Sequence, residues 1–110
     1  MLRLHAKPAV SSADWENCSF TLDIILDHEL RIRTRLAYFG IWGAIGSDDP
    51  RPFVLTSDGS IDFGGGFEGD DRFASTNLLT KIIRVDEYFT FIKEDEELTL
   101  RIAKVTDLNE

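Results

Sequence analysis

The sequence predicts a mainly β fold: a small antiparallel β-sandwich or partly open barrel, formed by a meander of about seven strands with one or two short helices. Apolar and polar residues alternate with a period of two along most of the chain, as in strands with one buried face. Turn-forming residues separate these runs at short intervals. The 110 residues include eight Phe, two Trp and two Tyr, enough for the core of one domain spanning residues 1–110.

The N-terminal alternating runs are the clearest strands. Residues 2–7 place Leu and Ala on one side and Arg, His and Lys on the other, and we expect an edge strand there. Residues 18–26 alternate again, and residues 30–36 do so after a break at Asp27-His28. We interpret these two runs as a long antiparallel hairpin. Residues 11–16 have a hydroxyl cap candidate and early acidic residues, which favour a short helical turn.

The middle of the chain is more mixed. Residues 36–46 are apolar and aromatic with glycines spaced by three, which indicates a buried strand end followed by a bend. Residues 53–56 and 60–63 flank Asp58-Gly59, a pair that suits a tight hairpin turn. In residues 70–79 an Asp could cap a helix, although Ser-Thr-Asn within the segment forms helices poorly, so both interpretations stay open.

The C-terminal third predicts further strands. Residues 82–85, 88–93 and 98–105 are rich in β-branched and aromatic side chains. Residues 94–97 are all acidic, and we interpret them as a solvated turn between the last two strands. The chain therefore ends in a meander.

The charge of the chain limits its partners. It carries 20 acidic and 12 basic side chains, a net charge of −8, and the excess lies after residue 40. Nucleic acid and anionic membranes are therefore not expected as partners, because both are bound by clustered Lys and Arg. A protein with a basic surface fits better. Cys18 is the single cysteine, so we expect a reducing, cytoplasmic setting.

One glycine-rich pattern and one set of acidic residues resemble ligand-binding motifs, but the surrounding sequence does not favour ligand binding. Residues 64–69 match G-x-G-x-x-G, but the acidic pair Asp70 and Asp71 follows where phosphates would lie. We interpret the segment as a flexible or bulged loop that displays Phe67. The carboxylates of this region do not match the spacing of a calcium-binding loop, so we expect no metal and no cofactor.

Arg31, Arg33 and Arg35 are the most specific cationic feature. On one strand face they would lie about 7 Å apart and could bind a carboxylate, a phosphate or an acidic peptide. In the expected hairpin, however, Asp23 would face Arg33. Thr21 would likewise face Arg35, so we favour cross-strand pairing as the explanation of the pattern. The ladder could also pair with acidic loops of the same chain or of a second subunit.

The residues do not suggest an enzyme, since His5 and His28 are isolated and no hydroxyl has a nucleophile setting. The leading hypothesis is a non-enzymatic protein-binding module, in its most concrete form an acidic inhibitor or immunity-type protein that neutralises a cationic partner. Aromatic anchors and acidic steering groups form the expected binding set: Trp42, Phe39, Phe67, Asp70, Asp71, Glu94, Glu96 and Glu97. Two alternatives remain: a carrier or sensor of small anionic molecules with an aromatic pocket, and a self-associating structural subunit.

Overall fold

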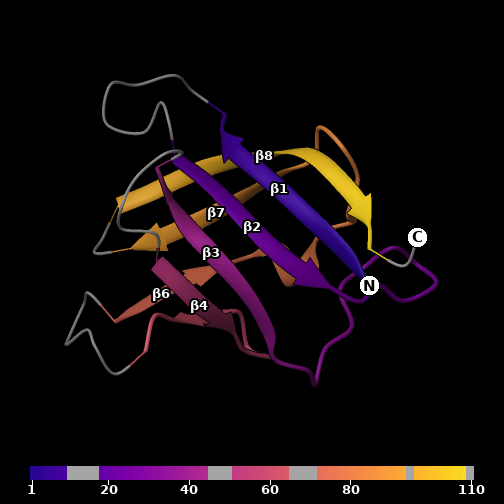
Figure 1. Cartoon of the computed structure of the whole chain (residues 1–110), viewed down its shortest axis with the longest axis horizontal. Helices are drawn as coiled ribbons and strands as arrows, with labels where there is room; N and C mark the ends of the chain where they lie inside the picture. Colours follow the sequence, from indigo (N-terminus) through magenta and orange to yellow (C-terminus); the bar gives the residue numbers. More distant parts are fainter. Residues whose placement is uncertain (10–17, 45–50, 65–71, 94–95, 109–110) are drawn as a thin grey trace.

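The computed structural model describes residues 1–9, 18–44, 51–64, 72–93 and 96–108, and its strands form one closed antiparallel barrel (Figure 1). The elements are β1 (Leu2–Pro8), β2 (Cys18–Ile24), β3 (Tyr38–Ala44), β4 (Arg51–Leu55), β5 (Ser60–Asp62), β6 (Phe73–Thr76), the 3-10 turn η2 (Leu78–Thr80), β7 (Tyr88–Lys93) and β8 (Glu96–Asp107). Each strand pairs with the next along the chain, and β8 pairs with β1. The predicted mainly β, antiparallel meander is confirmed, with eight strands and a closed sheet.

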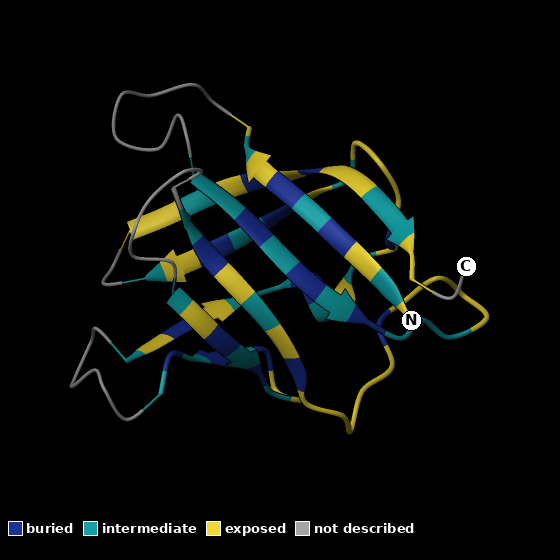
Figure 2. Cartoon of the chain, viewed as in Figure 1, coloured by how far each residue is buried: buried dark blue, intermediate teal, exposed yellow. Residues whose placement is uncertain are grey.

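The alternation in the sequence becomes an inside and an outside of the barrel. Figure 2 shows buried and more exposed residues alternating along β1 to β4. Phe20 lies at the centre of the interior, with its ring centroid 5.2 Å from that of Phe53 and 5.3 Å from that of Phe89. Phe91 completes this cluster and stacks on Trp42 at 4.8 Å. Packed aromatic side chains therefore fill the centre of the barrel.

The first strand is not at an edge, contrary to expectation. On one side of β1, Leu4 pairs with Leu22 of β2, and on the other side it pairs with Val105 of β8. The β1–β8 ladder shifts register between His5 and Ala6, which marks a bulge or irregularity at the seam. Alternation reports only which face of a strand is buried, so it does not distinguish an edge strand from a strand paired on both sides.

The expected hairpin of residues 18–26 with 30–36 is wrong. β2 ends at Ile24 and pairs with β1 and β3, while residues 25–37 form an irregular connection. Leu30 and Arg35 have φ angles of 64° and 71°, a left-handed conformation that interrupts an extended strand. Ile32 is buried and forms one isolated bridge, with Leu26. The alternation of apolar and basic residues over 30–36 therefore reflects the burial of Ile32 and not a strand.

The other local predictions have mixed outcomes. The Asp58-Gly59 hairpin turn is confirmed, with φ of 87° at Gly59 and its amide donating to the Thr56 carbonyl at 3.1 Å. The strand at 88–93 is confirmed, and the strand predicted at 98–105 lies within β8. Among the described residues of 70–79 there is a strand and the single turn η2 instead of a helix, and residues 82–85 are not a strand. The turn predicted at 11–16 lies outside the described residues.

Gly40 permits close packing in the barrel wall. A Cβ atom built at this position would lie 2.5 Å from the Thr21 carbonyl oxygen and would overlap the ring of Phe53. We therefore expect Gly40→Ala to lower the free energy of unfolding by about 1 to 3 kcal/mol, because the backbone oxygen cannot move aside. Urea denaturation measures the change. Ser75→Ala at an exposed position of β6 is the control and should change it by less than about 0.5 kcal/mol. An unchanged Gly40→Ala variant would contradict this packing.

Candidate functional site

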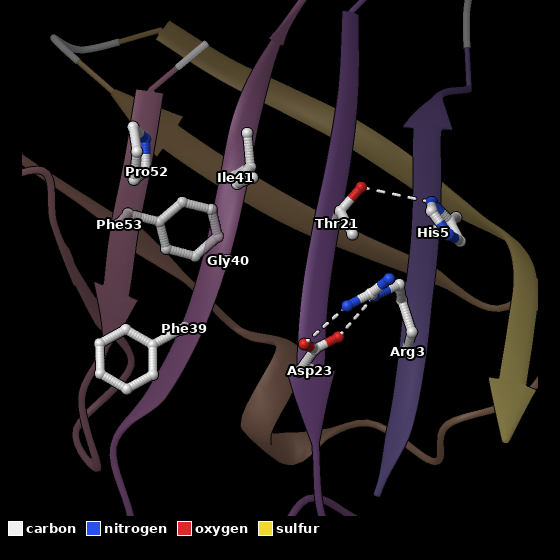
Figure 3. A pocket seen from close by; sticks show the side chains of 9 residues that line it. All are labelled: Arg3, His5, Thr21, Asp23, Phe39, Gly40, Ile41, Pro52 and Phe53. Carbon is white, nitrogen blue, oxygen red and sulfur yellow. Dashed lines mark hydrogen bonds and ion pairs between the residues drawn. The ribbon is translucent and has the colours of Figure 1, made fainter. Parts of the chain in front are cut away.

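The candidate site is a pocket of about 430 Å³ on the outer wall of the barrel, across β1 to β4 (Figure 3). Its lining residues are Arg3, His5, Thr21, Asp23, Phe39, Gly40, Ile41, Pro52 and Phe53. In Figure 3 the polar side chains stand on β1 and β2, and the apolar ones stand on β3 and β4. The pocket thus has one polar and one apolar side.

Strand register creates this arrangement. Arg3 is opposite Asp23, and His5 is opposite Thr21, across the β1–β2 ladder. Thr21 is in turn opposite Ile41 of β3, which is opposite Pro52 of β4. Because these residues all occupy outward positions, the register aligns them in rows across the outer surface.

The Arg3–Asp23 ion pair forms one end of the polar side. Nε of Arg3 donates to Oδ1 of Asp23 at 2.8 Å, and Nη2 donates to Oδ2 at 3.1 Å. The hydrogen bond from Arg3 lowers the pKa of the Asp23 carboxyl group, so both groups stay charged at neutral pH. Since both side chains are 30% or more exposed, the pair adds little to stability. Its main effect is to fix the position of the guanidinium group.

His5 forms the other end of the polar side. Its Nδ1 atom shares a hydrogen bond of 3.2 Å with the Thr21 hydroxyl group. Burial lowers the pKa of the imidazole below its ordinary value of 6.5, and the nearby charges of Arg3 and Lys104 lower it further. The imidazole is therefore uncharged at neutral pH. It can offer a hydrogen bond without adding to the positive charge of Arg3.

The apolar side is an exposed strip formed by Phe39, Ile41 and Pro52. Phe39 is 72% exposed and Ile41 is 48% exposed, and Pro52 is also exposed. Gly40 has no side chain, and the ring of Phe53 lies against its backbone on the inner side. Neighbouring large apolar side chains with this degree of exposure are typical of a surface that binds a ligand or another protein.

A second ion pair lies beyond the strip. Val54 of β4 is opposite both Phe39 of β3 and Asp62 of β5. Asp62 accepts a hydrogen bond from Nε of Arg72 at 3.0 Å, which lowers the pKa of its carboxyl group. The apolar strip is therefore flanked by ion pairs on both sides. An apolar centre with a polar rim is the usual anatomy of a protein interface.

The residues predicted for partner binding are only partly brought together. Phe39 lies in the pocket wall, and Glu96 and Glu97 are exposed at the start of β8. Trp42 is a core residue, 6% exposed and stacked on Phe91, because its position on β3 points inward. Four predicted residues lie outside the described part of the chain: Phe67, Asp70, Asp71 and Glu94.

The predicted ladder of Arg31, Arg33 and Arg35 does not form, because residues 25–37 are not a strand. All three side chains are exposed on that connection. Asp23 pairs with Arg3 instead of facing Arg33. Arg3 and the other polar lining residues were not predicted as site residues from the sequence. The only sequence signal for them is the alternation of residues 2–7, which places Arg3 and His5 on the polar face.

The described residues hold no group of three or more His, Cys, Asp or Glu side chains placed to bind a metal ion. Among them, no helix combines the length and the apolar character needed to cross a membrane. Cys18 is half-buried, and burial raises the pKa of its thiol, which keeps it protonated and weakly nucleophilic at neutral pH. Comparison of the chain with protein-family models, curated proteins and solved structures finds no match.

The lowered pKa of His5 predicts a pH dependence of stability. Below its ordinary pKa of 6.5, the imidazole is protonated more readily in the unfolded chain than in the folded one, so the free energy of unfolding falls as the pH falls. We expect His5→Gln to remove this component while leaving the loss at lower pH that comes from carboxylates such as Asp23. Urea denaturation between pH 7.5 and pH 5 tests this, with His28→Gln, at a side chain 92% exposed, as the control. Identical profiles for His5→Gln and wild type would contradict the assigned environment.

Proposed function

We propose that the protein is a non-enzymatic binding module that docks a protein partner with a basic surface against the outer wall of its barrel. The observation that carries this proposal is the exposed strip of Phe39, Ile41 and Pro52 beside the pocket. Apolar and aromatic side chains at the centre of an interface supply most of the binding energy when they are desolvated.

The exposure of the strip favours a macromolecular partner over a small ligand. Small molecules bind in clefts that bury most of the ligand and its apolar contacts. Here Phe39 stands 72% exposed at the pocket rim, so a molecule filling about 430 Å³ would leave much of that ring in water. The aromatic cluster around Phe20 occupies the barrel centre, where a carrier would hold its ligand. A protein surface would cover the strip and the flanking ion pairs together.

The charge distribution supports a cationic partner. The described residues contain ten acidic and twelve basic side chains, whereas the connecting segments 10–17, 45–50, 65–71 and 94–95 contain nine acidic and no basic ones. In the antiparallel meander, these segments all join strands at the same end of the barrel. Pro52 is the second residue of β4, directly after segment 45–50, so the strip begins close to that end.

This combination suits an inhibitor or immunity-type protein for a cationic toxin or nuclease. Carboxylates at one end raise the rate of encounter with a basic surface, and this contribution falls as salt screens it. Burial of Phe39 and Ile41 then slows dissociation, because separation would return these apolar side chains to water. The proposed setting is the cytoplasm, where the single thiol of Cys18 stays reduced.

Affinity capture with the full chain from native cytosol at low salt tests the proposal. We expect one basic protein to be retained in stoichiometric amount and to elute as salt increases. Phe39→Asp should reduce its capture by about tenfold or more, the effect of losing a central anchor. The matched control is Tyr88→Asp on β7, where the native ring is 50% exposed and does not line the pocket.

Two results would count against the proposal. If wild type and Phe39→Asp captured equal amounts of the basic protein, the strip of Phe39, Ile41 and Pro52 would not belong to the interface. Retention that does not respond to ionic strength would exclude steering by carboxylates. Circular dichroism checks that both variants fold. We expect that they do, because substitution of an exposed side chain usually changes the free energy of unfolding by less than about 0.5 kcal/mol.

A further inference from the structure

The seam between β1 and β8 contains a bulge that changes which way the side chains of β8 face. His5 is opposite Lys104, and the next residue of β1 is opposite Ile102. Ala103 is therefore the extra residue of the bulge. Strict alternation from the buried Ile102 would turn residue 104 inward. Instead residues 103 and 104 are both exposed, and Val105 packs against the core. The bulge thus places Lys104 on the outer wall, across the seam from His5.

Basic side chains gather around His5 on this wall. Arg3 and Lys7 lie two positions from it along β1, one on each side, and Lys104 is opposite it on β8. Residues 2–8 and 101–106 contain no acidic side chain. After burial, the charges of Arg3 and Lys104 are the largest causes of the lowered pKa of His5, and Lys7 adds to them. We call these four residues the seam cluster.

Three carboxylates of the described residues lie beside the seam cluster, and none of them forms an ion pair with its two lysines. Asp23 accepts two hydrogen bonds from Arg3. Asp86 lies 3.9 Å from Arg101 of β8. Asp107 ends β8, beyond Arg3. Within the described part of the chain, the charges of both lysines are therefore available to a ligand.

The available donors of the seam cluster suit an anion with several oxygen atoms. Nδ1 of His5 shares its hydrogen bond with Thr21, which leaves Nε2 to donate. Arg3 uses Nε and Nη2 on Asp23 and keeps Nη1. Opposite residues of an antiparallel ladder have Cβ atoms about 5 Å apart, and neighbours on one face of a strand are about 7 Å apart. A phosphate group has at least three acceptor oxygens and up to two charges, so it meets more of these donors than a carboxylate does.

We infer that the seam cluster binds a phosphate group, as free inorganic phosphate or as a phosphate monoester. Lys7 and Lys104 supply charge from two strands, and His5 donates a hydrogen bond between them. Arg3 supplies a further N–H from a guanidinium group that Asp23 holds in place. The net charge of −8 does not prevent this, because charges beyond about 8 Å are largely screened at physiological salt. The inference needs neither Phe39 nor a protein partner, so it does not rest on the proposed function.

The NMR signals of the two histidine rings in the full chain test the inference. At neutral pH and constant ionic strength, inorganic phosphate should shift the His5 signals saturably. It should also raise the pKa of His5, because a bound dianion stabilises the imidazolium form. His28, whose side chain is 92% exposed, is the internal control and should show no saturable shift. Glycerol phosphate distinguishes the two sources, since tighter binding of the monoester indicates a phosphorylated compound and tighter binding of inorganic phosphate indicates the free ion.

Substitution of one lysine locates the site. Lys104→Gln should weaken phosphate binding by about threefold to fivefold, the effect expected for one exposed charge contact. Lys81→Gln removes the same charge from a half-buried lysine after η2, outside the cluster, and should leave the affinity unchanged.

Three outcomes would overturn the inference. The His5 signals would not respond to phosphate, acetate at the same ionic strength would shift them as strongly, or Lys81→Gln would weaken binding as much as Lys104→Gln. Phe39→Asp should still bind phosphate, which separates this result from the fate of the proposed function.

Discussion

The contact between Phe20 and Phe53 is the interaction on which the rest of the structure depends. Their ring centroids lie 5.2 Å apart, and Phe20 also contacts Phe89 and Phe91. Through these contacts one ring of β2 packs against β4 and β7, strands from different parts of the barrel. Phe53 reaches this position because Gly40 has no side chain to occupy the space. Each such aromatic pair contributes about 0.5 to 1.5 kcal/mol beyond area burial.

The same packing produces the outer surface. Since inward positions of β2, β3 and β4 are fixed by the core, the outward positions and their cross-strand neighbours are fixed as well. Phe39 and Ile41 then stand between the Arg3–Asp23 and Asp62–Arg72 ion pairs. Those exposed pairs add little stability. Their consequence is a surface with an apolar centre and fixed polar neighbours, which is the geometry on which the proposed function rests.

The sequence predicted what depends on local pattern and failed where the outcome depends on strand order. Alternation identified β2, and Asp58-Gly59 identified its hairpin, because each reflects nearby residues. The arginine ladder was predicted because Leu30 and Ile32 alternate with arginines. It does not form, because Leu30 and Arg35 have left-handed backbone conformations that no sequence pattern indicates. Phe39 was selected as an aromatic candidate. Its neighbours Arg3 and His5 were missed, because only the β1–β2–β3 pairing brings residues so distant in sequence beside it.

The net charge of −8 conceals a strong asymmetry. The described residues carry a small excess of positive charge, and the acidic excess lies in segments that join strands at one end. A molecule with separated charge is oriented by the field of a charged partner as well as attracted by it. In the proposed function, a basic partner therefore meets the end with the acidic segments first, next to Pro52 and the strip that begins there. Orientation before contact reduces the angular search that limits most protein association rates, so the charge asymmetry and the wall strip act in the same encounter.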